Sequence, residues 1–363
     1  MNTYAEINLA ATKSNIAQIK AFISAGSKFM AVVKANAYGH GAAAVARAAV
    51  EAGADYLGVA NLKEALELRE TGILSPILIL TESPISVADE IIQHSLTQTI
   101  YSFSEAKALS EEAQKRKRPV KVHVKIDTGM GRVGVAPSEA MAFITKITSL
   151  PGLELEGVFT HFAKAEDPED HFTGEQFEKF KQIVDRLPQI KLKHAANSAA
   201  ALFHPETHLD MVRVGLMMYG LYPQGNARRV LSLSPALAFK TRVSYVKKVP
   251  AGTPLSYGST FTTQGETSIV TLPVGYADGY SRRLSNRGHV LIRGRRYPIV
   301  GRVSMDLTLV NINHDRVEVG DEAVLIGEQS GQGISADEIA ALEETISYEV
   351  VCSIGRRVPR VYK

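Results

Sequence analysis

The feature that most constrains the fold is an alternation of short apolar runs with segments of helical period between residues 29 and 214. Each apolar run has the length of a buried strand, and most are followed by a segment whose apolar residues recur three and four positions apart. The runs cover 29–33, 56–60, 77–80, 97–101, 120–126, 157–162, 192–195 and 211–214. Strands and helices alternating in this number and order within about 200 residues predict a TIM-type (β/α)8 barrel.

The main alternative for any such alternation is a doubly wound open sheet. That fold usually carries a glycine-rich phosphate-binding fingerprint after its first strand. Neither G-x-G-x-x-G nor a Walker A motif follows the first strand here. We therefore favour the barrel, with predicted helices at 12–22, 42–51, 62–70, 104–115, 138–148 and 174–186.

The texture of the sequence changes after residue 232. Strand-like runs separated by Gly, Pro or Asn turns follow at 238–249, 268–272, 290–292, 298–300, 307–310 and 322–326. One helix is predicted at 336–345, with Ser335 and Glu338 spaced as a capping box. The chain thus divides into a barrel domain at 1–232 and a mostly β domain at 233–363. The alternating segment 3–9 is a half-buried strand that we expect to pair with the second domain.

Composition excludes several classes of protein. A net charge of +3 is too small to indicate binding to nucleic acid or to an anionic membrane. The basic run at 115–118 has the character of a solvated helix end. Cys352 is the only cysteine, which excludes an intramolecular disulfide and fits a reducing compartment. With no secretory pattern and no apolar run of membrane-spanning length, we expect a cytoplasmic protein.

A single lysine, Lys34, follows the first barrel strand and precedes the turn Tyr-Gly-His-Gly. Burying a charged amine is costly, so a lysine at the end of an apolar strand needs a reason. In one interpretation the ammonium group emerges into solvent at the rim of the barrel. In the other, a partly desolvated amine of lowered pKa serves a Schiff base or a proton transfer.

Lys34 is one of several residues that stand at predicted strand ends, where a barrel places its active site. They are Lys34, Lys125, Asp127, Arg132, His161, Asn197, Ser198, Arg213 and Gly215. Each has an ordinary structural explanation, such as a buried histidine satisfied by hydrogen bonds or a lysine that points outward. All of them falling on one rim by chance is much less probable than any one alone.

The alternatives to a lysine-centred site are weak. The histidines lack the spacing of a zinc site, so no metal is expected, and there is no G-x-S-x-G elbow for a serine hydrolase. Backbone and hydroxyl donors at Asn197, Ser198, Gly215 and Leu216 lie where barrels often hold a phosphate. An aldehyde cofactor that carries a phosphate would fit, with Lys34 forming the imine.

The motif AVVKANAYGHG around Lys34 resembles the cofactor-lysine motif of alanine racemases, which depend on pyridoxal 5'-phosphate. The resemblance continues through both domains. It includes KIDTGMGRVG at 125–134, THFAKAE at 160–166, HAANSAA at 194–200, MVRVGLMMYG at 211–220, LSYGSTF at 255–261, LPVGYADGY at 272–280, VGRVSMD at 300–306 and SYEVVCSIGRRVPRVY at 347–362. It implies interconversion of L- and D-alanine, which supplies D-alanine for peptidoglycan.

The resemblance also implies a role for each matching residue. Lys34 would be the Schiff-base lysine and one catalytic base, and Tyr257 the second base, contributed by the partner in a homodimer. His161 and Arg213 would support that tyrosine, with Arg213 at the cofactor ring nitrogen, and Asp306 would have a supporting role. Cofactor contacts would fall on Lys34, Tyr38, Asn197, Ser198, Arg213, Gly215, Leu216 and Tyr348.

The substrate carboxylate would be bound by Arg132 and the Met305 backbone. Lys125 matches a lysine that is carbamylated in many relatives. Glu166, Tyr276 and Arg302 match the substrate access corridor, where Glu166 replaces a shorter acid, and Ser304 stands where cysteine is frequent.

Other functions remain open on the sequence. The site could belong to an alanine/serine racemase of broader specificity. Less favoured are a non-catalytic pyridoxal-phosphate carrier, which would lack the second domain, and a barrel-type amino-acid decarboxylase, which would need a catalytic cysteine in a motif that Cys352 does not match.

Overall fold

The structure is a computed structural model that describes residues 2–223 and 230–363. The described residues form two compact units, of which the first comprises residues 12–37, 42–223 and 230–234. The second comprises residues 2–11, 38–41 and 235–363. The division near residue 234 lies two residues after the expected one, and the second unit includes two short segments from the first fifth of the chain.

The first unit is built on an eight-stranded parallel sheet with the strand order β8-β7-β6-β5-β4-β3-β2-β9. The strands are β2 (Lys28–Val32), β3 (Tyr56–Val59), β4 (Ile77–Ile79), β5 (Thr97–Ile100), β6 (Val120–Lys125), β7 (Leu153–Phe159), β8 (Leu192–His194) and β9 (Met211–Val214). β9 meets β8 through backbone bonds from Asp210 N to Lys193 O and from Arg213 N to Ala196 O. The predicted barrel is confirmed.

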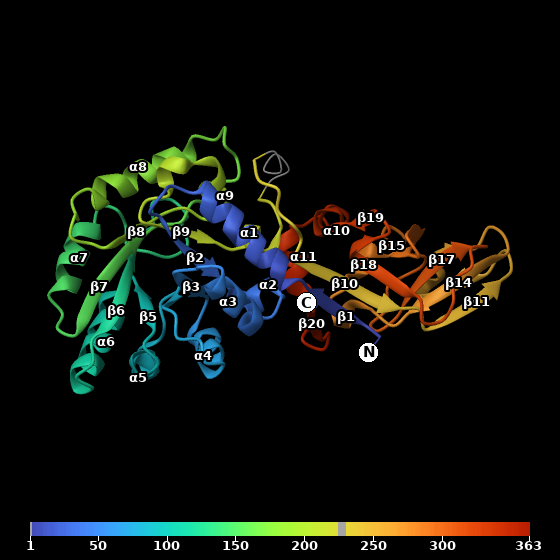
Figure 1. The fold of residues 1–363 in the computed structure, drawn as a ribbon, viewed down its shortest axis with the longest axis horizontal. Helices are drawn as coiled ribbons and strands as arrows, with labels where there is room; N and C mark the ends of the chain where they lie inside the picture. The colour runs from blue at the N-terminus through green and yellow to red at the C-terminus, as the bar shows by residue number, and fades with distance from the viewer. Residues whose placement is uncertain (1, 224–229) are drawn as a thin grey trace. The chain divides into compact units, whose positions relative to one another are not determined.

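Helices lie outside the strands of this barrel (Figure 1). They are α1 (Leu9–Phe22), α3 (Ala42–Glu51), α4 (Leu62–Glu70), α5 (Ala88–Gln93), α6 (Phe103–Lys115), α7 (Ala140–Thr148), α8 (Phe172–Val184) and α9 (Ser198–Phe203). The sequence did not predict α5 and α9, which are each only six residues long. Inside the barrel Met30, Tyr56, Leu78, Leu192 and Met211 pack into one apolar cluster.

One barrel strand differs clearly from its prediction. The expected run 157–162 is in fact β7, Leu153–Phe159, so the strand begins and ends earlier. Glu154 and Glu156 hid its first half, because charged residues are rarely buried in a central strand. Glu156 is nevertheless only 7% exposed. The shift places Thr160 and His161 just beyond the strand, at its carboxyl end.

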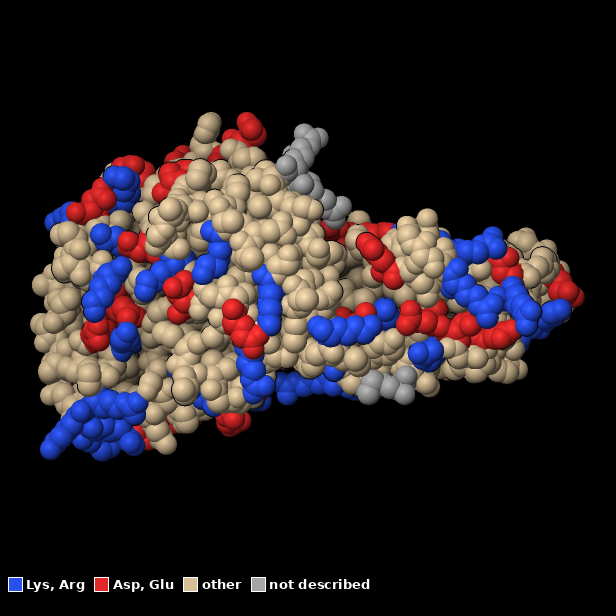
Figure 2. All heavy atoms as spheres, in the orientation of Figure 1, with Lys and Arg blue, Asp and Glu red and all other residues tan. Residues whose placement is uncertain are grey.

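The basic run at the end of α6 forms the patch of blue atoms at the lower left of Figure 2. Its residues Lys115–Arg118 are exposed. Arg116 pairs with Glu112 and Asp89, and Lys115 pairs with Glu112. These contacts are those of a solvated, ion-paired helix end.

The second unit is mostly β structure, as expected. Its largest sheet has the order β16-β15-β18-β10-β1-β20, with β19 beside β18. The sheet contains β1 (Tyr4–Ile7), β10 (Leu237–Arg242), β15 (His289–Ile292), β16 (Arg295–Pro298), β18 (Glu322–Gln329), β19 (Gln332–Ile334) and β20 (Arg360–Tyr362). β1 pairs antiparallel with β10 and parallel with β20.

Two smaller sheets and two helices complete this unit (Figure 1). They are β11 (Tyr245–Val249), β14 (Thr267–Leu272) and β17 (Thr308–Asn313) in one sheet, β12 (Pro254–Leu255) and β13 (Phe261–Thr262) in the other, α10 (Ala336–Glu343) and α11 (Ser347–Ser353). Ser335 caps α10 by accepting from Glu338 N, but the Glu338 carboxylate pairs with Arg296. No helix among residues 2–223 and 230–363 is long and apolar enough to cross a membrane.

Candidate functional site

The backbone after Lys34 turns in the left-handed sense. Lys34 is half-buried beyond the end of β2, and Ala35, Asn36, Ala37 and Tyr38 all have φ of 52–53°. For residues with a side chain, each such position costs about 1–2 kcal/mol. The sequence predicted only an ordinary turn here, centred on Tyr-Gly-His-Gly.

Hydrogen bonds from outside the turn hold this strained backbone in place. Glu64, on α4, accepts from Ala35 N at 2.7 Å and from Ala60 N at 2.7 Å. Asn36 Oδ1 accepts from Ala42 N at 2.9 Å, at the start of α3. The position of Lys34 is thus fixed by its neighbours. Sequence reasoning missed Glu64, whose only indication was an acid in the first turn of a helix.

The turn continues into Tyr38 and Gly39, which belong to the second unit. The rings of Tyr38 and Tyr348 lie 6.1 Å apart between centroids, and burial raises the pKa of Tyr38. Gly39 has φ of +82°, and a Cβ there would lie 2.2 Å from Val351 O. The structure therefore brings two predicted cofactor residues together, beside a backbone approach that only glycine permits.

We expect Gly39→Ala to destabilise the protein more than the positive φ alone explains. Gly331 provides the control, because it has φ of +80° and a Cβ added there would meet no atom within 4 Å. Gly331→Ala should cost about 1–2 kcal/mol from φ. Gly39→Ala should cost about 1–3 kcal/mol more from the clash. Thermal melting of the two variants checks this, and equal melting temperatures would contradict the clash.

A group of cationic side chains lies at the carboxyl ends of the barrel strands. Lys125 is 5% exposed, and its pKa is lowered to about 8 by burial and by the charges of Arg132, Arg213 and Lys34. Asp127 opposes this shift, and it also accepts from the backbone N–H groups of Gly129, Gly131 and Arg132. These mutual effects show that the predicted rim residues gather in one place.

Arg213 is the most buried member of this group, at 4% exposed. Its Nη2 donates to Thr160 O at 2.8 Å and Ala195 O at 2.9 Å, and lies 3.2 Å from His161 Nδ1. Burial lowers the pKa of Arg213 to about 9, which leaves it charged at neutral pH. Burial, with Arg213 next, lowers the pKa of His161 well below its usual range. His161 is therefore neutral and accepts from Arg213.

The corner between β8 and β9 brings Asn197, Ser198, Gly215 and Leu216 together. Asn197 caps α9 by accepting from Ala200 N at 2.9 Å. Ser198 Oγ accepts from Gly215 N at 3.0 Å, and Leu216 opens a short 3-10 turn, Leu216–Tyr219. Ser198 and Leu216 are buried. Glu166 is exposed between β7 and α8, and no hydrogen bond or ion pair of the described residues joins it to the cationic group.

The remaining predicted residues lie on exposed turns of the second unit. Tyr257 is 71% exposed, and a Cβ on its neighbour Gly258 would lie 3.6 Å from Arg302 Nε. Ser256 Oγ donates to Arg302 O at 2.7 Å, which ties the two turns together. Tyr276 and Met305 are 44% and 52% exposed.

Arg357 links the turn at residues 276–278 to the turn at residues 304–306, and the sequence did not indicate this role. It donates to Asp278 at 2.6 Å and to Asp306 at 2.5 Å. Backbone bonds join Tyr276 N to Ser304 O and Ala277 N to Met305 O, each at 3.0 Å. The motif SYEVVCSIGRRVPRVY contains Arg357 but does not indicate which of its arginines reaches the acids.

The fold and this cationic rim define a two-unit barrel protein with a site suited to an anionic ligand. Residues 7–223 match the family described as "Alanine racemase, N-terminal domain", and residues 236–362 match "Alanine racemase, C-terminal domain". The chain therefore belongs to the alanine racemase family.

Individual relatives agree with this assignment. "Alanine racemase 2" of Caldanaerobacter subterraneus subsp. tengcongensis is 48% identical over 99% of this chain and 94% of its own length. The alanine racemase structure from Clostridium difficile 630 has a TM-score of 0.96 at 40% identity, covering 100% of this chain and 96% of that one. The Bartonella henselae structure, which is described with covalently bound pyridoxal phosphate, has a TM-score of 0.91 at 29% identity with both chains fully covered.

Proposed function

We propose that this protein is a pyridoxal 5'-phosphate-dependent alanine racemase that interconverts L- and D-alanine with two bases. The observation that carries the proposal is the cationic group of Lys34, Lys125, Arg132 and Arg213 at the carboxyl ends of the barrel strands. Gathering the unmodified side chains of these four residues around one carboxylate, Asp127, is unfavourable unless anions join them, and with Lys125 carbamylated the three remaining cations still face a cofactor phosphate and a substrate carboxylate. A phosphorylated cofactor and a substrate carboxylate supply that negative charge, so the residues present fit the cofactor.

In this proposal Lys34 Nζ would hold the cofactor covalently. Arg213 would donate to the ring, with Tyr38, Tyr348 and the Asn197–Ser198 and Gly215–Leu216 corner at the phosphate. When bound, pyridoxal phosphate supplies an electron-withdrawing ring that acidifies the alanine Cα–H. Arg213 stays charged and cannot accept a proton, which tempers that withdrawal and favours simple return of the proton over side reactions.

Racemisation needs a proton to leave one face of Cα and to return on the other, and one fixed base does this poorly. We assign Lys34 to one face and Tyr257 to the other. Tyr257 is 71% exposed in the single chain, which favours its insertion into a partner's site in a homodimer. Arg132 and the Met305 backbone would bind the substrate carboxylate, and Asp306 would support that turn. Glu166, Tyr276 and Arg302 would line the access corridor. Supply of D-alanine for peptidoglycan in the cytoplasm is the role we propose.

The test is racemisation of a panel of L-amino acids by the purified protein, with and without added pyridoxal phosphate. We expect alanine to be racemised only when the cofactor is present. Activity on serine would extend the substrate range. Failure of the cofactor-loaded protein to racemise alanine would refute the proposal.

We also propose that Lys125 is carbamylated. Its neutral amine would attack carbon dioxide, forming a C–N bond and releasing a proton, and would leave an anion beside Arg132. The pKa of about 8 makes this reaction accessible, since an ordinary lysine titrates near 10.4. The neutral fraction grows as pH rises through 8, so carbamate should increase in that direction.

The measurement is carbon-13 NMR of the native protein equilibrated with labelled bicarbonate. We expect a carbamate resonance that is absent from Lys125→Arg and retained in Lys121→Arg, since Lys121 is paired with Glu156 at the other end of β6. A spectrum without that resonance at pH 8 would rule the modification out.

A further inference from the structure

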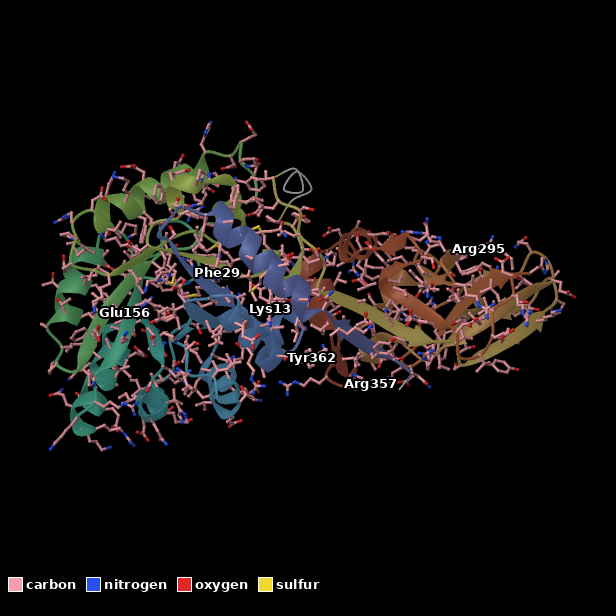
Figure 3. All side chains as sticks on the ribbon, in the orientation of Figure 1. Lys13, Phe29, Glu156, Arg295, Arg357 and Tyr362 are labelled. Carbon is pink, nitrogen blue, oxygen red and sulfur yellow. The ribbon has the colours of Figure 1, made fainter. Side chains whose placement is uncertain are left out.

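A carboxylate lies inside the barrel, away from the cationic group. Glu156 projects from β7 and is 7% exposed (Figure 3). It accepts from Tyr56 Oη, which also contacts Thr97 Oγ1 at 3.1 Å, and it pairs with Lys121. Burial alone would raise the pKa of Glu156, but hydrogen bonds from His123, Lys121 and Tyr56 outweigh it and lower the pKa to about 2. Glu156 is therefore an anion at any working pH.

Two fully buried histidines connect this anion to Arg213. His123 Nε2 lies 3.4 Å from Glu156 Oε2, and His123 Nδ1 lies 2.9 Å from His194 Nε2. His194 Nδ1 lies 3.2 Å from Arg213 Nη1. β7, β6, β8 and β9 each contribute one of the four side chains, so this hydrogen-bonded series crosses the barrel interior.

Neighbouring residues pack tightly against the imidazole rings of His123 and His194. A Cβ on Gly157 would lie 2.7 Å from His123 Nδ1 and Cε1, so a side chain there would displace the ring. Phe159 stacks on His194 with the ring centroids 4.8 Å apart and the planes 5° apart. The guanidinium of Arg213 lies over the same Phe159 ring at 5.3 Å. The rings therefore have little freedom to turn.

Hydrogen-bond chemistry then fixes the position of every proton in the chain. An ionised carboxylate only accepts, so His123 carries its hydrogen on Nε2 and presents a lone pair at Nδ1. His194 must donate from Nε2 to that lone pair, which leaves its own Nδ1 as the acceptor for Arg213. This order requires neutral histidines, and burial lowers the pKa of both.

The other acceptors of Arg213 are the Thr160 and Ala195 carbonyl groups and His161, all of them neutral. A buried cation with only neutral partners is costly. We propose that Glu156 is the counter-anion of Arg213, acting through His123 and His194, and that these three positioning residues set the orientation and charge that Arg213 presents to the cofactor ring. The inference rests on the proposed function, since it requires Arg213 at that ring.

The test compares holoenzymes carrying Glu156→Gln and Glu154→Gln. Glu154 stands two residues earlier on β7 and pairs at the surface with Lys191 at 3.2 Å, so it controls for loss of a carboxylate from the same strand. We expect Glu156→Gln to shift the absorption spectrum of the bound cofactor and to lower kcat about tenfold in both directions, the size of a typical coupling between sites. KM for alanine should stay near the wild-type value, and Glu154→Gln should match wild type throughout.

His194→Asn provides an independent route if Glu156→Gln folds poorly. The asparagine oxygen can still accept from Arg213, but the side chain is too short to reach His123. We expect the same spectral shift. In the double variant that carries both substitutions, Glu156→Gln should add nothing to the effect of His194→Asn, because both interrupt the same series of hydrogen bonds.

The outcomes are distinct. A wild-type protein without cofactor absorbance or racemisation defeats the proposed function. If the wild type is active but the Glu156→Gln or His194→Asn variant has an unchanged spectrum and kcat, the proposed relay, the hydrogen-bonded series from Glu156 through His123 and His194 to Arg213, is wrong. Additive effects in the double variant also overturn it, since independent structural damage adds.

Discussion

Lys34→Ala is expected to abolish racemisation in both directions and to remove the visible absorption band of the bound cofactor. The change deletes the amine that we propose to hold the cofactor and to move a proton on one face of Cα. The loss of rate should be at least about 10³-fold, since a positioned acid–base group alone contributes 10²–10⁴. Racemase assays from each enantiomer and an absorption spectrum with added pyridoxal phosphate measure it.

Lys28 offers a matched control for this variant. It stands at the opposite end of the same strand and is exposed, so Lys28→Ala should keep both the band and the activity. A Lys34→Ala protein that retains the band would mean that another lysine holds the cofactor.

Tyr257→Phe should separate the two directions of the reaction. Removing the phenolic O–H deletes one of the two proposed bases and leaves the other in place. Proton abstraction from one enantiomer should therefore fall by about 10²–10⁴. Hydrogen exchange from the other enantiomer should fall much less, and deuterium incorporation from heavy water into each enantiomer measures both.

The control is Tyr245→Phe, a second exposed tyrosine of the same unit, at 57%. It should leave both exchange rates unchanged. If Tyr257→Phe reduces the two exchange rates equally, the two-base scheme is wrong.

The barrel could be predicted from the sequence because its strands are short, apolar and regularly spaced. The prediction failed where a strand contains charge. The first half of β7 was missed because Glu154 and Glu156 interrupt its apolar pattern, although tertiary partners accommodate Glu156 in the interior. Similarly, the capping box was half right, because Arg296 takes the Glu338 carboxylate. Contacts of this kind depend on residues far away in the sequence.

In the candidate site, too, some features could be predicted from local sequence and others depend on contacts with residues far away in the sequence. Lys34, Lys125 and Arg213 could be singled out because they stand at predicted strand ends, where barrels converge, whereas the residues of the second unit were predicted only from the family resemblance. The left-handed turn after Lys34 was not found, because Ala35 and Ala37 have no local preference for positive φ. The bonds that hold the turn run from Ala35 N to Glu64 and from Ala42 N to Asn36, and the sequence indicates neither of them. The relay from Glu156 to Arg213 was invisible as well, because its four members are spread over β6 to β9.

The place of β1 in the sheet has a consequence for how the protein is made. β1 lies between β10 and β20, and Ile7 pairs with Leu237 and Tyr362. At about 5–20 residues per second, the ribosome needs roughly 12–46 s to deliver Leu237 after Ile7. During that time the first strand has none of its native partners, and an unpaired strand is prone to aggregate. β1 therefore cannot complete its pairing until Tyr362 has been made, long after the barrel strands that follow it in the sequence.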